Sequence, residues 1–205
     1  KMKHISPLVD DLVEAFRCLP GVGPKSAKRM VLYLLENHRE EGKNLAKSLI
    51  ETLEKVGQCE QCRIFSEKNI CNICEDQKRD SKLLCIVESV TDVFAIEESN
   101  QYRGRYFVLH GHLSPIDNIG PEELGLENLI HLVKTEVFSE IILATNSTLE
   151  GEATANFIFE VLKEISSLSI SRLARGVPLG GELEYVDGGT IMHAISGRTN
   201  LKRAD

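Results

Sequence analysis

The sequence lacks several features that would place it in a class of protein at once. It has no apolar stretch long enough to cross a membrane, and its first residues lack the apolar core of a signal peptide. It also lacks fixed-period repeats, low-complexity segments and an excess of positive charge, since its formal net charge is -7. These absences predict a cytoplasmic protein whose surface is not basic as a whole. They do not exclude nucleic-acid binding, because a local basic patch can act within an acidic chain.

The chain has strand-like and helix-like patterns in alternation. Its 205 residues are enough for one or two compact domains with a buried core. Apolar runs of strand length occupy residues 82–87, 105–109 and 140–144. A helical pattern follows the first run as far as about residue 98, and another follows the third run over residues 153–165. This spacing predicts βαβ units and a parallel sheet in an α/β domain.

A basic segment lies near the start of the chain. Apolar residues at helical spacing predict a helix over residues 8–17, and Pro20 with two glycines interrupts it. A second helix is expected to begin near Pro24. From Arg17 to Leu35 the chain carries basic residues and no acidic ones, which locally reverses the sign of the overall charge.

Residues 19–29 resemble a helix-hairpin-helix DNA-binding motif. Glycines at the turn would let the backbone approach a phosphate, and the start of the second helix would direct N–H groups at the anion. The expected DNA-binding residues are Gly21, Gly23, Lys25, Lys28 and Arg29. Such a contact reads the nucleic-acid backbone, so binding should be independent of base sequence and strongly dependent on salt. The alternative is an ordinary helix–turn–helix corner whose glycines only permit the turn.

Four of the 6 cysteines form two Cys-x-x-Cys pairs separated by eight residues. Each pair can direct two sulfurs at one ion, and two pairs complete the tetrahedral shell of structural zinc, with no open position for a catalytic water. The expected zinc ligands are Cys59, Cys62, Cys71 and Cys74. Disulfides are not expected in the cytoplasm, and a redox Cys-x-x-Cys usually occurs once, at a helix start after a strand. Cys18 and Cys85 have no partner at ligand spacing and are predicted to be buried.

A short polar stretch follows the third apolar run, over residues 144–152. It resembles the Asp-x-Asp-x-Glu-Gly-Glu element of TOPRIM domains, the magnesium-binding fold of topoisomerases and primases. Asn146 and Thr148 stand where that element has its two metal-binding aspartates. An amide and a hydroxyl supply none of the carboxylate charge that holds Mg²⁺. The resemblance, which covers residues 82–172, therefore implies a TOPRIM scaffold without its metal chemistry.

Three carboxylates remain at the predicted edge of the sheet. Glu88 ends the first strand, where TOPRIM domains carry a general acid or base, and Glu150 and Glu152 follow the third strand. They could bind a weak metal, pair with basic residues or accept lysines of a partner protein, and the missing aspartates favour the last two. The alternative for Glu88 is an ordinary solvated strand end. We expect a vestigial or partner-binding acidic site and no catalytic residue.

The order helix-hairpin-helix, four cysteines and TOPRIM resembles one family in particular, the bacterial recombination mediators of the RecR family. Further similarity lies in residues 101–105, 113–117, 120–124, 171–181 and 183–185, whereas residues 110–112 and 187–190 depart from the family pattern. The resemblance implies a non-enzymatic, ring-shaped tetramer that clamps double- and single-stranded DNA. It also implies action with RecO, and in some cases RecF, to load the recombinase RecA onto gapped DNA during repair.

The expected organisation has four parts: a helical DNA-binding region at residues 1–56, a zinc finger at 57–78, a TOPRIM domain at 79–172 and a C-terminal arm at 173–205. The arm is expected to pack on another subunit, with a surface turn as the alternative. Two other functions stay open. One is a Mg²⁺-dependent nuclease or topoisomerase that uses the three carboxylates, and the other is a pure protein-interaction scaffold. The absence of an obvious tyrosine nucleophile in a separate domain disfavours the enzyme.

Overall fold

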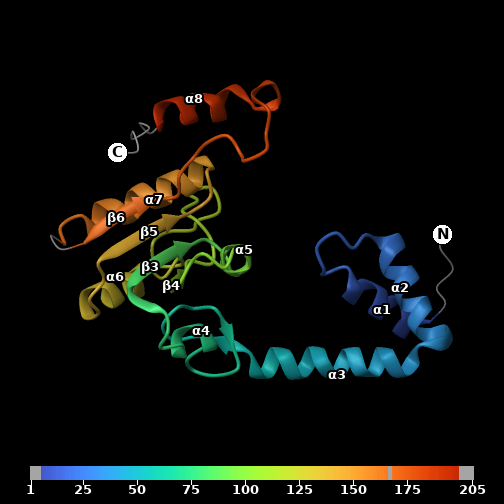
Figure 1. Ribbon diagram of the computed structural model, residues 1–205. Helices are drawn as coiled ribbons and strands as arrows, with labels where there is room; N and C mark the ends of the chain where they lie inside the picture. The colour runs from blue at the N-terminus through green and yellow to red at the C-terminus, as the bar shows by residue number, and fades with distance from the viewer. Residues whose placement is uncertain (1–5, 166–167, 199–205) are drawn as a thin grey trace. The chain divides into compact units, whose positions relative to one another are not determined.

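A computed structural model describes residues 6–165 and 168–198 (Figure 1). The chain divides into two compact units, Lys1–Val56 and Gly57–Asp205. No helix in the described ranges is long and apolar enough to cross a membrane. Parts of the expected first and last domains, residues 1–5 and 199–205, lie outside the described residues.

The first unit consists of three helices, α1 (Pro7–Phe16), α2 (Pro24–Asn37) and α3 (Arg39–Lys55). The helices predicted from residue 8 and from Pro24 are confirmed, and Pro occupies the first turn of both. Among its described residues only Ala27 and Val31 are buried. The prediction of a buried Cys18 is wrong, because this thiol lies in the exposed turn after α1.

The second unit begins with a small cysteine-containing segment. Strands β1 (Gly57–Gln58) and β2 (Phe65–Ser66) pair in antiparallel fashion, and the one-turn helix α4 (Asn72–Glu75) follows. The chain therefore folds back on itself around the first cysteine pair.

A parallel sheet forms the centre of the second unit. Its strands are β3 (Asp80–Val87), β4 (Gly104–Val108), β5 (Glu140–Ala144) and β6 (Ser169–Arg172), in the order β4-β3-β5-β6. Leu83 pairs with Glu140 and Val87 with Ala144, so the carboxyl ends of β3 and β5 lie at the same edge. The predicted α/β fold with a parallel sheet is confirmed.

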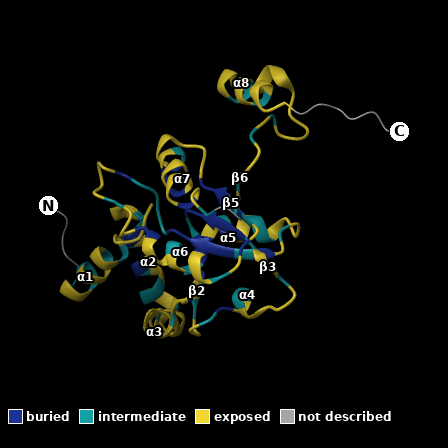
Figure 2. Cartoon of the chain, turned by 90° about the vertical axis from the view of Figure 1, so that its left-hand side faces the viewer, coloured by how far each residue is buried: buried dark blue, intermediate teal, exposed yellow. Residues whose placement is uncertain are grey.

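Helices cover the two faces of this sheet differently. Alternate strand residues such as Leu84 and Ile86 pack with α6 (Leu126–Thr135) and α7 (Leu149–Leu162) in one buried cluster. The intervening residues Cys85 and Val87 pack with α5 (Val90–Glu98) in a second cluster that also contains three cysteines of the preceding segment. Figure 2 shows the strands as the buried centre of the unit. Cys85 is buried, as predicted.

Several elements were not predicted or differ in extent. Helices α3 and α6, strand β6, a short 3₁₀ helix (Leu183–Tyr185) and helix α8 (Gly188–Ser196) had no assignment from the sequence. Helix α7 begins at Leu149 and not at residue 153, because Thr148 caps its first turn. The predicted arm thus contains helical structure within its described residues.

Candidate functional site

Four cysteine sulfurs meet in the segment that precedes the sheet. Cys59 and Cys62 lie between β1 and β2, and Cys71 and Cys74 lie at and within α4. Each offers one sulfur, and the four atoms all lie within 4.8 Å of one another. Zn–S bonds of about 2.3 Å place sulfurs about 3.8 Å apart in a tetrahedron, so the spacing matches one ion. The four predicted ligands fit a structural zinc site.

The protein environment of these thiols also suits a cation. Burial raises the pKa of Cys59, but surrounding backbone N–H groups outweigh it and bring the pKa to about 7. One of these donors is the N–H of Cys71, 3.3 Å from the Cys59 sulfur. The pKa of Cys71 is raised to about 11, first by burial. Four thiols packed this closely cannot all ionise alone, and Zn²⁺ supplies the compensating charge.

Arg63 joins this cysteine segment to the sheet. It follows Cys62 in the left-handed conformation, with φ of 63°. Its guanidinium donates to the carbonyl oxygen of Leu124 and lies 5.5 Å from the centre of the Phe107 ring. Leu124 is 61 positions away along the chain. Sequence reasoning therefore missed Arg63, since no local pattern signals a contact of that range.

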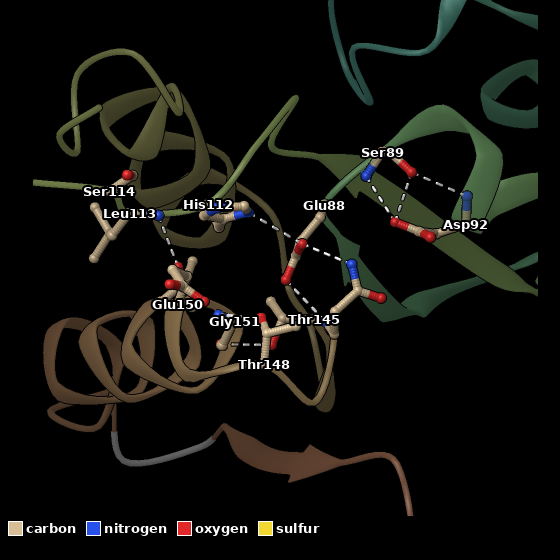
Figure 3. A network of polar contacts seen from close by, with 12 residues as sticks. Glu88, Ser89, Asp92, His112, Leu113, Ser114, Thr145, Thr148, Glu150 and Gly151 are labelled. Atoms are coloured by element: carbon tan, nitrogen blue, oxygen red, sulfur yellow. Dashed lines mark hydrogen bonds and ion pairs between the residues drawn. The ribbon is translucent and has the colours of Figure 1, made fainter. Parts of the chain in front are cut away.

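The carboxyl edge of the sheet is organised around Glu88. This side chain follows β3 and is buried, with 5% of the residue exposed. Its carboxylate accepts the backbone N–H of Asn146 at 2.8 Å and the side-chain amide of Asn146 at 2.7 Å. Nδ1 of His112 lies 3.5 Å from the same carboxylate (Figure 3). Glu88 is thus a buried acceptor that joins the ends of β3 and β5, and it is not a solvated strand end.

Asn146 and Thr148 have structural roles where TOPRIM domains bind metal. The Asn146 amide donates to Glu88, whereas an aspartate would present a second negative charge to it. The Thr148 hydroxyl accepts the N–H of Gly151 at 3.1 Å and caps α7. N–H donors here occupy the Glu88 oxygens that a metal would need. The residues at this edge do not fit Mg²⁺.

Gly151 lets the start of α7 approach Glu88. A Cβ at this position would lie 2.7 Å from Glu88 Oε1 and would also collide with the backbone of Asn146. Any larger residue would push α7 away from the strand ends. The glycine of the degenerate TOPRIM stretch therefore has a packing reason that is independent of metal.

The three predicted carboxylates do not form one group. Among the described residues, the cysteines are the only set of three or more potential ligands close enough to hold one metal. Glu152 pairs with Arg172 at 2.6 Å and with Arg175, and its pKa is lowered, first by Arg175. Glu150 is exposed on the first turn of α7. Pairing with basic residues, one of the expected alternatives, occurs at Glu152, whereas Glu88 is buried and bonded to Asn146.

A hollow of about 450 Å³ lies beside the Glu88 edge. The zinc segment forms one wall through Phe65, which is 59% exposed and lies 5.7 Å, ring centre to ring centre, from His110. The start of α5 and His112 line the other side. The structure therefore places the zinc segment and the degenerate TOPRIM edge around one surface depression.

The hairpin of the first unit leaves space at its turn. Gly21 has φ of 78°, which requires glycine, and Gly23 caps α2 with φ of -81°. A Cβ on Gly23 would meet nothing within 4 Å. Neither the conformation nor the packing of this chain therefore requires glycine at position 23. The space is available to an approaching phosphate.

The predicted basic residues share one face of α2. Lys25, Lys28 and Arg29 line a shallow hollow of about 510 Å³ together with Tyr33 and Glu36. Their spacing of three and four residues puts them on neighbouring turns. Within the described ranges, no ion pair is recorded for these three cations. Their charges remain available to an anion.

Four protein-family models match successive parts of the chain. The model for the RecR helix-hairpin-helix matches residues 9–53, and that for the RecR four-cysteine zinc finger domain matches residues 56–76. The model for the Toprim domain matches residues 82–174, and that for the RecR C-terminal region matches residues 176–199. Their order along the chain agrees with the resemblance drawn from the sequence.

Proposed function

The chain belongs to the RecR family, and on that premise we propose that it is a non-enzymatic, sequence-independent DNA clamp. Its matched domains support a role as a recombination mediator in DNA repair. The proposal adds that it binds double- and single-stranded DNA and acts with RecO, and possibly RecF, to load RecA on gapped DNA. A homotetramer held partly by the arm at residues 173–205 is part of the same proposal.

The observation that supports DNA binding most directly is the basic face of α2, which lies beside an open glycine turn. Lys25, Lys28 and Arg29 line one hollow, and a side chain on Gly23 would meet no atom of this chain. Phosphate binding at a helix start uses backbone N–H groups and nearby cations together. Such a site contacts the nucleic-acid backbone and gives no base specificity.

The Glu88 edge supports the non-enzymatic part of the proposal. Asn146 binds the Glu88 carboxylate through two N–H donors, and Thr148 caps α7. A Mg²⁺-dependent TOPRIM enzyme would instead need carboxylates at these two positions to hold its ion. Zinc, held by the four cysteines, has a structural role in the proposal.

The test of DNA binding is the double substitution Lys25→Ala with Arg29→Ala. Removing two phosphate contacts should weaken binding at low salt and make the slope of log K against log salt shallower by about 1.5–2. The matched control is Arg39→Ala with Lys47→Ala, which removes the same charges from exposed positions of α3. Fluorescence anisotropy with single- and double-stranded oligonucleotides over a salt series measures both quantities. Equal affinity and slope in the double variant and the wild type would refute the basic-face assignment.

Two further experiments address the rest of the proposal. Light scattering with and without DNA and RecO measures whether the chain is a tetramer and whether partners change its size. A DNA cleavage and relaxation assay with Mg²⁺ or Mn²⁺ separates the clamp from the enzyme. Turnover that Glu88→Ala abolishes would establish the enzyme and overturn the proposed function.

A further inference from the structure

A groove lies between α6 and α7 on the outside of the second unit. Leu126, Ile130, Phe157 and Val161 line it, together with the loop that precedes α6, and its volume is about 380 Å³. Phe157 is 37% exposed and Val161 is 38% exposed, although the adjacent Ile158 and Leu162 are fully part of the core. Helix α7 thus carries a second apolar stripe that the fold does not bury.

The rim of this groove is acidic. Glu122, Glu123 and Glu127 line it, and none of the other described residues that line it is basic. In the described part of the chain, no salt bridge is recorded for these three carboxylates. Two backbone N–H groups, its own and that of Gly120, lower the pKa of Glu123. The groove therefore combines an apolar floor with uncompensated negative charge along one side.

We propose that this groove is a docking surface for a basic amphipathic helix of a partner protein. Apolar side chains at positions i, i+3 or i+4, and i+7 of such a helix would enter between α6 and α7. Lysine or arginine residues beside them would face the acidic rim, where complementary charge favours association and excludes acidic partners. Docking here does not require DNA binding by the helical unit.

Charge favours a basic helix in this groove over two alternatives, DNA and a second copy of this chain. DNA would bring phosphates against the rim carboxylates, which repel them. A second copy docked groove against groove would bring acidic rim against acidic rim. The chain's net charge of -7 makes that approach still less favourable. A cationic helix meets neither obstacle.

The test uses the full chain and a synthetic helical peptide about five turns long, with leucine on one face and lysine and arginine on the other. We expect saturable binding in fluorescence anisotropy, with weaker binding as salt increases. A scrambled peptide of the same composition and a peptide with glutamate in place of the basic residues should bind at least about tenfold more weakly. Equal binding of the scrambled or the acidic peptide would overturn the docking surface.

Substitutions locate the binding to the groove. Phe157→Ala should weaken it about tenfold or more, and Glu122→Lys with Glu127→Lys should weaken it and reverse the preference for the basic peptide. The controls are Phe94→Ala and Glu98→Lys, which change an exposed phenylalanine and an exposed glutamate of α5, on the other face of the sheet. Equal loss in the control variants would overturn the assignment.

Two other readouts separate this proposal from self-association and from DNA binding. If Phe157→Ala lowers the oligomeric state in light scattering and the wild type binds no peptide, the face is an interface between copies and the proposal is wrong. Phe157→Ala should leave DNA affinity unchanged, whereas Lys25→Ala with Arg29→Ala should leave peptide affinity unchanged. The proposal for the groove and the proposal for the DNA-binding face can therefore be refuted independently of each other.

Discussion

Asn146→Asp tests the idea that this chain has exchanged a metal site for a hydrogen-bonded one. The wild-type amide donates to a Glu88 oxygen at 2.7 Å, and Glu88 is 5% exposed. Aspartate has nearly the same shape as asparagine, but it replaces the donor with a second negative charge. The substitution therefore changes the electrostatics of the edge and leaves its volume almost unchanged.

The expected cost follows from two effects. A hydrogen bond to a charged group contributes about 1.5–3 kcal/mol, and the variant loses it. Two carboxylates about 4 Å apart repel by about 4 kcal/mol at an effective dielectric constant of 20. We expect Asn146→Asp to lower the free energy of unfolding by about 5.5–7 kcal/mol at pH 7 without divalent metal, which is the sum of the two effects. Asn146→Ala is the control, since it removes the donor and adds no charge, and it should lose about 4 kcal/mol less.

Urea unfolding followed by circular dichroism gives both differences, and two conditions sharpen the test. Lowering the pH should reduce the defect of Asn146→Asp, because the folded variant gains a proton between the facing carboxyls and this proton restores a donor. Adding Mg²⁺ should stabilise Asn146→Asp more than the wild type, because the ion can then bind between two carboxylates. A variant as stable as the wild type at pH 7 without metal would refute the contact between Glu88 and position 146.

The remaining predictions concern the other parts of the second unit. The wild type should bind one zinc ion per chain, and chelation or Cys62→Ser should release it. Either change should also lower Tm, because the cysteines share a buried cluster with the α5 face of the sheet. An unchanged Tm would contradict this. Glu152→Gln should lower the free energy of unfolding by at most about 1 kcal/mol above pH 4.5, because Arg175 holds the pKa of Glu152 below its usual 4.5. The difference from the wild type should disappear as the pH falls. Urea titrations from pH 3 to 7 measure it, and a difference that grows in acid would contradict the prediction. Gly151→Ala should destabilise by about 1–3 kcal/mol, because its Cβ would collide with Glu88 and with the backbone of Asn146; thermal unfolding of the variant decides whether α7 approaches this closely.

Much of the framework could be predicted because its signals are local. Two Cys-x-x-Cys pairs predict four converging sulfurs, and Pro24 predicts the start of a helix, since both depend on neighbours along the chain. Three of the four strands of the sheet were predicted from apolar runs. Strand β6 was missed because Ser169–Arg172 is short and only partly buried, so it carries no continuous apolar run.

The errors come from places where burial depends on distant contacts. Cys18 was predicted to be buried on its residue type, but the helical unit buries few residues and leaves the turn after α1 exposed. The sequence placed Glu88 with Glu150 and Glu152 at one edge of the sheet, but it gave no sign that two donors from Asn146 make the burial of Glu88 possible. Residue type and local pattern do not contain this information.

The sequence alone therefore determined the order of the parts, the zinc ligands, the basic turn and the absence of the two metal-binding aspartates. Each of these is a matter of which residue types stand at which spacing. Only the tertiary structure showed that Asn146 donates to Glu88 and which arginines pair with Glu152. It also showed that α6 and α7 leave an apolar groove with an acidic rim. Those contacts join residues far apart in the chain, and their energies depend on burial and geometry that exist only after the strands have paired.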